Sequence, residues 1–156
     1  MASRAASPAR AIAYATLADL RYHLRRFLRV REVTAREAGI EPQQYLLLLQ
    51  VKGLDGRGLA TIGTLAERLQ ISHHGVVQLV DRLAERGLVE RRPGADRREV
   101  VVRLRSPADT ILRRLATHSI DELTKDGPVL VASLRRLIPQ STRGRSSRRG
   151  RGKARR

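Results

Sequence analysis

Residues 61–104 read TIGTLAERLQISHHGVVQLVDRLAERGLVERRPGADRREVVVRL, and this stretch decides the fold. Thr61 is placed to cap a short helix, and Ser72 is placed to cap a second helix that follows a tight turn at Gln70-Ile71. Gly87 stands just beyond the second helix, where glycine commonly ends a helix. Two short helices joined in this way predict a helix-turn-helix.

The two sides of each helix differ in chemistry. Apolar residues at helical spacing predict the buried sides, namely Leu65, Ala66 and Leu69 in the first helix and Val76, Val80 and Leu83 in the second. Five residues of the second helix are predicted to point outward: His73, His74, Val77, Gln78 and Arg82. A rigid helix with such an exposed side suits contact with base edges in the major groove of DNA.

A basic hairpin follows the two helices. Residues 88–92 and the valine-rich residues 99–104 predict two strands, and residues 93–96 supply the proline, glycine and aspartate typical of a turn. A basic hairpin directly behind a helix-turn-helix predicts a wing. Leu59-Ala60 is expected to form a very short strand before the first helix of the motif.

Two helices are predicted upstream. Residues 9–33 carry one apolar stripe (Leu17, Leu20, Leu24, Phe27, Leu28), and arginines that lie largely off it are expected to be solvated (Arg21, Arg25, Arg29, Arg31). Gly39 ends this pattern, and Pro42 opens a helix that ends near Lys52-Gly53 and points its leucines inward on nearly every side. A buried strand is the alternative there, but leucine without β-branched neighbours favours a helix.

Downstream of the hairpin, Ser106 is expected to cap a helix that has Pro107 in its first turn and continues to about Lys125. Asp126-Gly127-Pro128 is predicted to break the chain, and a last short helix follows to residue 138. From residue 139 onward the apolar residues stop, and eight positive charges stand among serine and glycine, so a disordered tail is expected.

The chain is strongly basic. It has 32 lysines and arginines against 15 acidic residues, a formal charge of +17, which predicts attraction to a polyanion such as nucleic acid or an anionic membrane surface. The tail contributes eight of these charges, which leaves +9 on residues 1–138. The folded part is therefore expected to be basic as well.

Several classes of function are not supported by the sequence. There is no cysteine, which excludes disulfides and cysteine-based redox sensing, and no apolar run approaches the roughly 20 residues that span a bilayer. His73 and His74 are neighbours whose side chains diverge on a helix, so no metal site is expected. No catalytic motif or cofactor-binding fingerprint is present, and the chain is expected to be neither an enzyme nor a cofactor-binding protein.

Residues 61–69 and 80–92 resemble the core signature of the MarR family of bacterial transcription factors, and Asp96-Arg97-Arg98 is similar to the wing motif of that family. Residues 39–45 stand at the family's Gly-Leu-Thr-Pro-x-Gln-aromatic helix start. The sequence departs from the pattern at Glu41, which replaces a capping hydroxyl, at Gly75 inside the second helix, and at residues 105–107.

The resemblance implies a mainly α fold with a small β wing, in which N- and C-terminal helices form a homodimer that carries two winged lobes. The expected organisation is a disordered N-terminus (1–8), a dimerisation helix (9–40), a winged helix-turn-helix lobe (41–104), C-terminal dimerisation helices (105–138) and the basic tail (139–156). The apolar stripes of the terminal helices agree with a dimer, because a lobe of about 64 residues is too small to cover them. Packing of those helices within one chain is the alternative.

By the same resemblance, Arg98 enters the minor groove and Asp96 supports it by a charge-assisted contact. The expected DNA-binding residues are Ser72, His73, His74, Val77, Gln78, Arg82, Arg97 and Arg98. Glutamine can pair with adenine through two hydrogen bonds, and valine can contact a thymine methyl group.

Two functions remain after the sequence has been considered. The first is a cytoplasmic, nucleoid-associated bacterial regulator that binds a pseudo-palindromic operator in double-stranded DNA, represses transcription and responds to a small-molecule effector. The second is a basic protein that coats nucleic acid without sequence preference. The high positive charge alone does not distinguish them.

Overall fold

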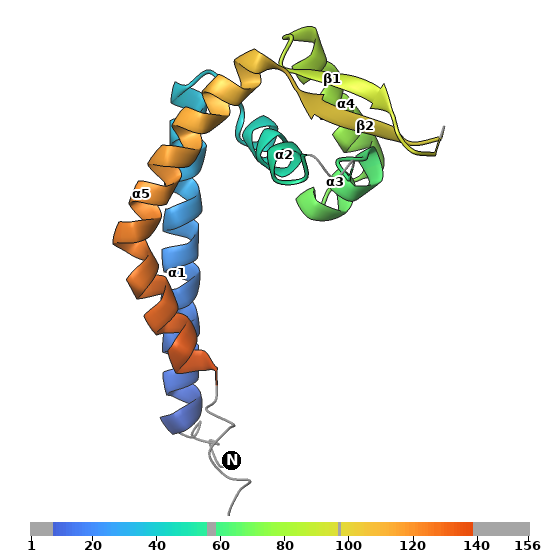
Figure 1. Cartoon of the computed structure of the whole chain (residues 1–156). Coiled ribbons are helices and arrows are strands. Elements are labelled where there is room, and N and C mark those ends of the chain that lie inside the picture. Colours follow the sequence, from blue (N-terminus) through green and yellow to red (C-terminus); the bar gives the residue numbers. More distant parts are fainter. Residues whose placement is uncertain (1–7, 56–58, 97, 139–156) are drawn as a thin grey trace, which may run out of the picture. The chain divides into compact units, whose positions relative to one another are not determined.

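The computed structural model describes residues 8–55, 59–96 and 98–138 (Figure 1). The predictions for residues 1–7, for the loop at 56–58, for Arg97 and for the tail at 139–156 lie outside the described residues. Seven elements follow in order: α1 (Pro8–Glu37), α2 (Pro42–Gly53), α3 (Ile62–Leu69), α4 (His73–Glu85), β1 (Val89–Pro93), β2 (Val100–Leu104) and α5 (Ser106–Leu137). The expected mainly α fold with a small β hairpin is confirmed.

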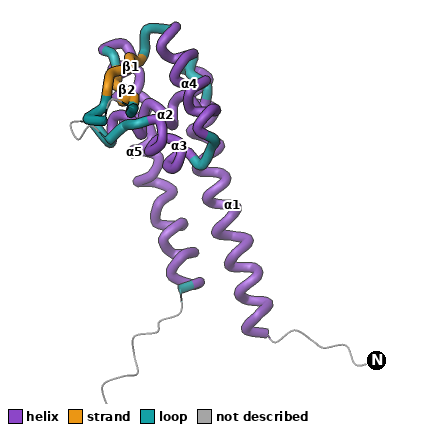
Figure 2. The backbone as a smooth tube through the Cα atoms, turned by 90° about the vertical axis from the view of Figure 1, so that its right-hand side faces the viewer, coloured by secondary structure: helices purple, strands orange, loops and turns teal. Residues whose placement is uncertain are grey.

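The chain divides into two units, which are considered separately. One comprises residues 26–125 and holds α2, α3, α4, both strands, the end of α1 and most of α5. The other comprises the ends of the chain, residues 1–25 and 126–156. Figure 2 shows the hairpin as the only orange segment among the helices of the described chain.

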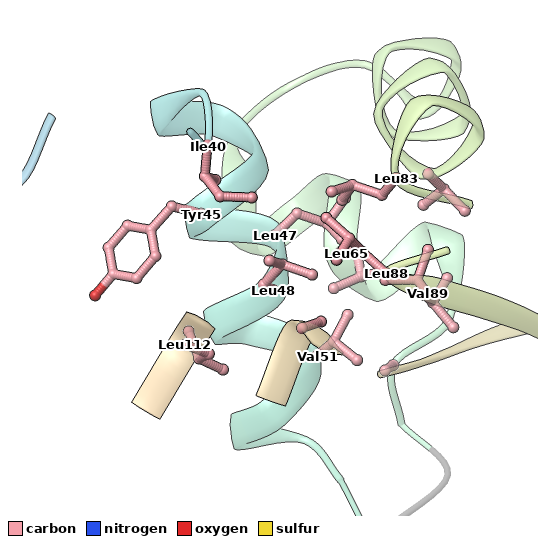
Figure 3. Close-up of a cluster of buried hydrophobic side chains, with 14 of the residues drawn as sticks. Ile40, Tyr45, Leu47, Leu48, Val51, Leu65, Leu83, Leu88, Val89 and Leu112 are labelled. Carbon is pink, nitrogen blue, oxygen red and sulfur yellow. The ribbon is translucent and has the colours of Figure 1, made fainter. Parts of the chain in front are cut away.

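The core of unit 26–125 is a cluster of aliphatic side chains from α2, α3 and α4. Leu47, Leu48, Leu65, Val80 and Leu83 have no exposed surface, and the close-up shows the labelled leucines converging (Figure 3). Each such side chain contributes roughly 1.5–3 kcal/mol when fully buried. The cluster extends beyond residues 41–104 at both ends, through Ala35, Ile40, Ala108, Leu112 and Leu115.

Burial of the α2 leucines is less complete than the sequence suggested. Leu47 and Leu48 are buried, but Leu46 and Leu49 retain 39% and 37% of their surface. The prediction that the leucines point inward on nearly every side is therefore wrong for these two residues. The cause is geometric, because residues 44, 47, 48 and 51 share the covered side of the helix and residues 46 and 49 share the other.

The hairpin pairs β1 and β2 in an antiparallel register in which Val89 faces Leu104 and Pro93 faces Val100. The short strand expected at Leu59-Ala60 does not form. In its place the backbone N–H of Val102 donates to the carbonyl of Ala60 at 2.9 Å, and an isolated bridge joins Thr61 to Val101. Thr61 already caps α3, so the chain turns away from the sheet after one bridge.

Helix α5 differs from its prediction in two ways. It begins at Ser106 itself, because the Arg105 carbonyl accepts from the backbone N–H groups of Ala108 and Asp109, so Ser106 is a helical residue and not the cap. It also continues through Pro128, where a break was expected. A proline removes one backbone donor and costs about 3 kcal/mol inside a helix, but the remaining hydrogen bonds on either side are retained.

Arg31 is also placed differently from its prediction. It was expected to be solvated but is only 9% exposed, and its Nη2 donates to the Ser119 carbonyl of α5 at 3.2 Å. Its guanidinium lies 4.3 Å from the ring centre of Phe27, a cation–π contact. The hydroxyl groups of Tyr45 and Ser119 are 3.3 Å apart, so α5 contacts both α1 and α2 through polar groups within this unit.

The start of α5 is tied to the end of α2 by an ion pair. The Asp109 carboxylate accepts from Lys52 Nζ at 2.6 Å and from Arg113 at 3.1 Å. The hydrogen bond from Lys52, and then that from Arg113, lowers the pKa of Asp109 below its ordinary value. The carboxylate is therefore ionised at neutral pH, and it lies in the first turn of the helix, where negative charge is favourable.

Arg86 joins the end of α4 to the beginning of α2. Its Nη1 donates to Gln44 Oε1 at 3.0 Å and its Nη2 donates to the Gly39 carbonyl at 2.8 Å. Gln44 is only 6% exposed, and the same oxygen accepts from the backbone N–H of Glu41 at 3.4 Å. One guanidinium thus satisfies two acceptors at the α1–α2 corner.

We expect Arg86→Ala to lower the free energy of unfolding by about 1–3 kcal/mol, because it leaves the Gln44 and Gly39 acceptors without this donor. Arg82→Ala removes an exposed arginine from the same helix and serves as the matched control. Urea denaturation followed by circular dichroism measures both. Equal stabilities for the two variants would contradict this role of Arg86.

Candidate nucleic-acid interface

The helix-turn-helix forms as the capping residues predicted. Thr61 Oγ1 accepts from the backbone N–H of Thr64 at 3.1 Å, and Ser72 Oγ accepts from that of Gly75 at 3.0 Å. Between the helices Gln70 adopts a left-handed conformation with φ of 54°. The turn was predicted but this conformation was not, because such positions usually hold glycine or asparagine.

Four predicted interface residues lie exposed on α4: His73, His74, Gln78 and Arg82. Val77 is a partial exception, because it is half-buried and packs against the core. The buried side is Val76, Val80 and Leu83, each with no exposed surface. The core therefore sets which side of α4 faces solvent.

Gly75 has a structural reason within α4. A Cβ atom at this position would lie 3.3 Å from Ser72 Oγ and 3.6 Å from Ile71 Cδ1. A larger residue would press on the hydroxyl group that caps the helix, whereas glycine costs roughly 1 kcal/mol in helix propensity relative to alanine. Glycine keeps the N-terminus of the exposed helix closely wound around its cap.

Two of the exposed side chains contact each other. Gln78 Nε2 lies 3.0 Å from His74 Nε2, one helical turn away. Both residues are exposed, so this hydrogen bond lies on the surface that is available to a ligand.

The wing is closed by its own backbone and by Asp96. The N–H of Gly94 donates to the Glu99 carbonyl and the N–H of Glu99 donates to the Asp96 carbonyl, both at 2.9 Å. Asp96 Oδ1 accepts from the backbone N–H of Arg98 at 3.0 Å. Asp96 therefore contacts the main chain of Arg98, whose side chain is exposed.

An ion pair connects the wing to α4. Arg91 of β1 donates to the Asp81 carboxylate, and Arg92 pairs with Glu90 at 2.6 Å. Sequence reasoning missed the Arg91–Asp81 pair, since the two residues are ten positions apart in different elements. The alternation of acids and arginines in residues 81–92 was the available signal.

Two other classes of site were also considered. Within residues 8–55, 59–96 and 98–138, no group of three or more histidine, cysteine or acidic side chains is arranged to hold a metal ion. Among the helices that the structure describes, none combines the length and apolar character needed to cross a membrane.

A helix-turn-helix whose second helix exposes one polar side, followed by a basic hairpin, defines a winged helix-turn-helix protein. Residues 38–99 match the family model described as the MarR family. The family resemblance is thereby confirmed, and the winged helix-turn-helix of this chain is that of the MarR family. Among curated proteins, no sequence matches the chain.

Solved structures agree with this fold. AbsC, a MarR family transcriptional regulator from Streptomyces coelicolor, shares 18% identity with a TM-score of 0.63, covering 88% of this chain and 86% of AbsC. Apo MarR from Escherichia coli shares 20% identity with a TM-score of 0.61, covering 88% of this chain and 100% of MarR. The Mycobacterium tuberculosis transcriptional regulator MosR, in complex with DNA, shares 21% identity with a TM-score of 0.53, covering 75% of this chain and 88% of MosR.

We expect Asp96→Ala to loosen the wing, because it removes the side-chain acceptor of the Arg98 N–H. Hydrogen exchange of the Arg98 amide, measured by NMR, is expected to quicken by roughly two- to tenfold. The Val102 amide, which donates to Ala60, is the internal control and is expected to keep its rate. An unchanged Arg98 rate would show that Asp96 does not support the wing.

Proposed function

We propose that this protein is a homodimeric regulator of transcription that binds double-stranded DNA at specific sequences. The observation that carries the proposal is the exposed side of α4, where His73, His74, Gln78 and Arg82 face solvent while the other side is buried. A polar helix held rigidly by a core is suited to the major groove. The similarity to MosR, a regulator solved in complex with DNA, agrees with this proposal.

The interface residues divide by chemistry. Gln78, His74 and the exposed part of Val77 are proposed to contact base edges. Ser72, His73, Arg82 and Arg97 are proposed to contact phosphates or bases nearby, and Arg98 to enter the minor groove beside the wing. Asp96 supports Arg98 through the main-chain hydrogen bond.

A dimer is proposed because unit 1–25 with 126–156 exposes much apolar surface. Its described part includes Tyr14, Leu17, Tyr22, Leu24, Val129, Val131, Leu134 and Ile138, each at least 42% exposed. Monomeric proteins rarely leave so many large apolar side chains in water. Two copies related by a two-fold axis would then bind a pseudo-palindromic operator with half-sites about 10 base pairs apart.

An effector site is proposed within unit 26–125. A pocket of about 300 Å³ lies between the end of α1 and α5, lined by Thr34, Glu37, Ala38, Arg114, Leu115 and His118. Arg114 and His118 can donate hydrogen bonds to a small anionic molecule. Binding there would bias the regulator, proposed to be a non-enzymatic repressor of the bacterial cytoplasm.

The proposal predicts that Gln78→Ala weakens binding to the preferred duplex by about 1–3 kcal/mol and changes binding to random duplex little, because it removes a base contact. Glu85→Ala, also exposed on α4, is the control and is expected to keep the ratio between the two duplexes. Fluorescence anisotropy across a salt series measures the affinities.

Deletion of residues 139–156 supplies the contrast in the same experiment. Phosphate contacts release counterions without distinguishing bases, so the deletion is expected to weaken both duplexes alike and flatten the salt dependence. If the deletion abolished sequence preference and Gln78→Ala changed nothing, the non-specific coating protein would replace the regulator.

The proposed dimer predicts that Leu134→Glu dissociates the protein, because a buried carboxylate would face an apolar interface. Leu59→Glu changes a residue of equal exposure in the other unit, 48% against 47%, and is expected to leave the dimer intact. Sedimentation velocity at micromolar concentration distinguishes the two. A folded monomer in the unmodified protein would rule out the dimer.

A further inference from the structure

The contact between Gln78 and His74 restricts the chemistry of both side chains. The two atoms that meet, at 3.0 Å, are the amide Nε2 of Gln78 and the ring Nε2 of His74. An amide nitrogen only donates hydrogen bonds, so His74 Nε2 must be the acceptor. The ring is then neutral with its proton on Nδ1, and the amide group of Gln78 is held in one of its two orientations.

We propose that His74 is a specificity-determining residue that fixes the direction in which Gln78 reads an adenine. This inference rests on the proposed function and deepens it. Adenine offers N7 as acceptor and N6 as donor in the major groove, and a glutamine amide matches both at once. One Nε2 proton of Gln78 goes to His74, and the second proton and Oε1 remain available for N7 and N6.

The orientation matters because A·T and T·A pairs present the same two adenine atoms in opposite directions across the groove. A freely rotating amide can exchange its oxygen and nitrogen and so tolerate both pairs. In the present structure that exchange would place Oε1 against the lone pair of His74 Nε2, with two acceptors in contact. The bond therefore disfavours the reversed pair, which is how binding sites exclude a competitor.

A purely structural role is weaker on the same observations. Exposed pairs four residues apart on a helix stabilise it only slightly, and α4 is already held by its Ser72 cap and by its buried side. At a protein–DNA interface from which water is excluded, an unsatisfied donor or acceptor is far more costly. The contact therefore has its main effect when DNA is bound.

The experiment uses the full chain and begins with selection of preferred duplexes from a random pool. The adenine read by Gln78 is the position at which Gln78→Ala loses its preference. Affinities are then measured for three versions of that duplex, namely the A·T pair, the reversed T·A pair, and 7-deazaadenine, which lacks the N7 acceptor. The proteins are wild type, Gln78→Ala, His74→Ala, His74→Gln and the control Glu85→Ala.

For wild type and Glu85→Ala, both altered duplexes are expected to bind roughly five- to a hundredfold more weakly. Gln78→Ala is expected to be indifferent to both. His74→Ala is expected to lose most of the discrimination between A·T and T·A while circular dichroism stays unchanged. His74→Gln, which keeps an acceptor oxygen, is expected to restore part of it.

Two outcomes overturn the inference in different ways. An A·T to T·A ratio unchanged by His74→Ala, with Gln78→Ala still effective, contradicts the role of His74 and leaves the regulator standing. A pool that yields no preferred duplex contradicts the proposed function itself.

Discussion

Burial of Val76, Val80 and Leu83 against α2 and α3 holds α4 at one angle about its own axis. Successive residues of an α-helix are about 100° apart, so a rotation by one residue would bring these side chains into water. Each would lose roughly 1.5–3 kcal/mol of burial. The exposed side of α4 is thus fixed by the opposite side, and the chemistry offered to DNA depends on an aliphatic core that does not touch DNA.

Directional polar contacts refine what the core positions. Arg86 joins α4 to the α1–α2 corner, the Arg91–Asp81 pair joins the hairpin to α4, and Lys52 with Asp109 joins α2 to α5. Each links elements distant in sequence within unit 26–125. These links are surface or half-buried contacts of modest strength, so they adjust positions that burial has already determined.

The interface combines rigid and general components. The α4 side chains stand on a helix capped by Ser72, and Gly75 leaves room for that cap. The wing is supported by main-chain hydrogen bonds around Asp96. Positive charge over the chain supplies attraction to phosphates at any sequence, whereas only the rigid helix is suited to distinguishing bases. In the proposed regulator, specificity and general affinity therefore come from different parts of the chain.

The sequence by itself determined the features that depend on neighbouring residues. Caps at Thr61 and Ser72, the end of α4 at Gly87 and the turn of the hairpin follow from local chemistry, and so the winged helix-turn-helix was predicted. Which α4 residues are exposed followed from helical periodicity, apart from the half-buried Val77.

Only the tertiary structure decided which surfaces are covered. Arg31 is buried because Ser119, 88 residues away, accepts its hydrogen bond, and Leu46 is exposed because nothing in its unit covers that side of α2. The continuity of α5 through Pro128 and the Arg91–Asp81 pair likewise escaped local reasoning. Burial is a property of whatever packs against a residue, and spacing along the chain specifies a side of a helix without specifying its neighbour.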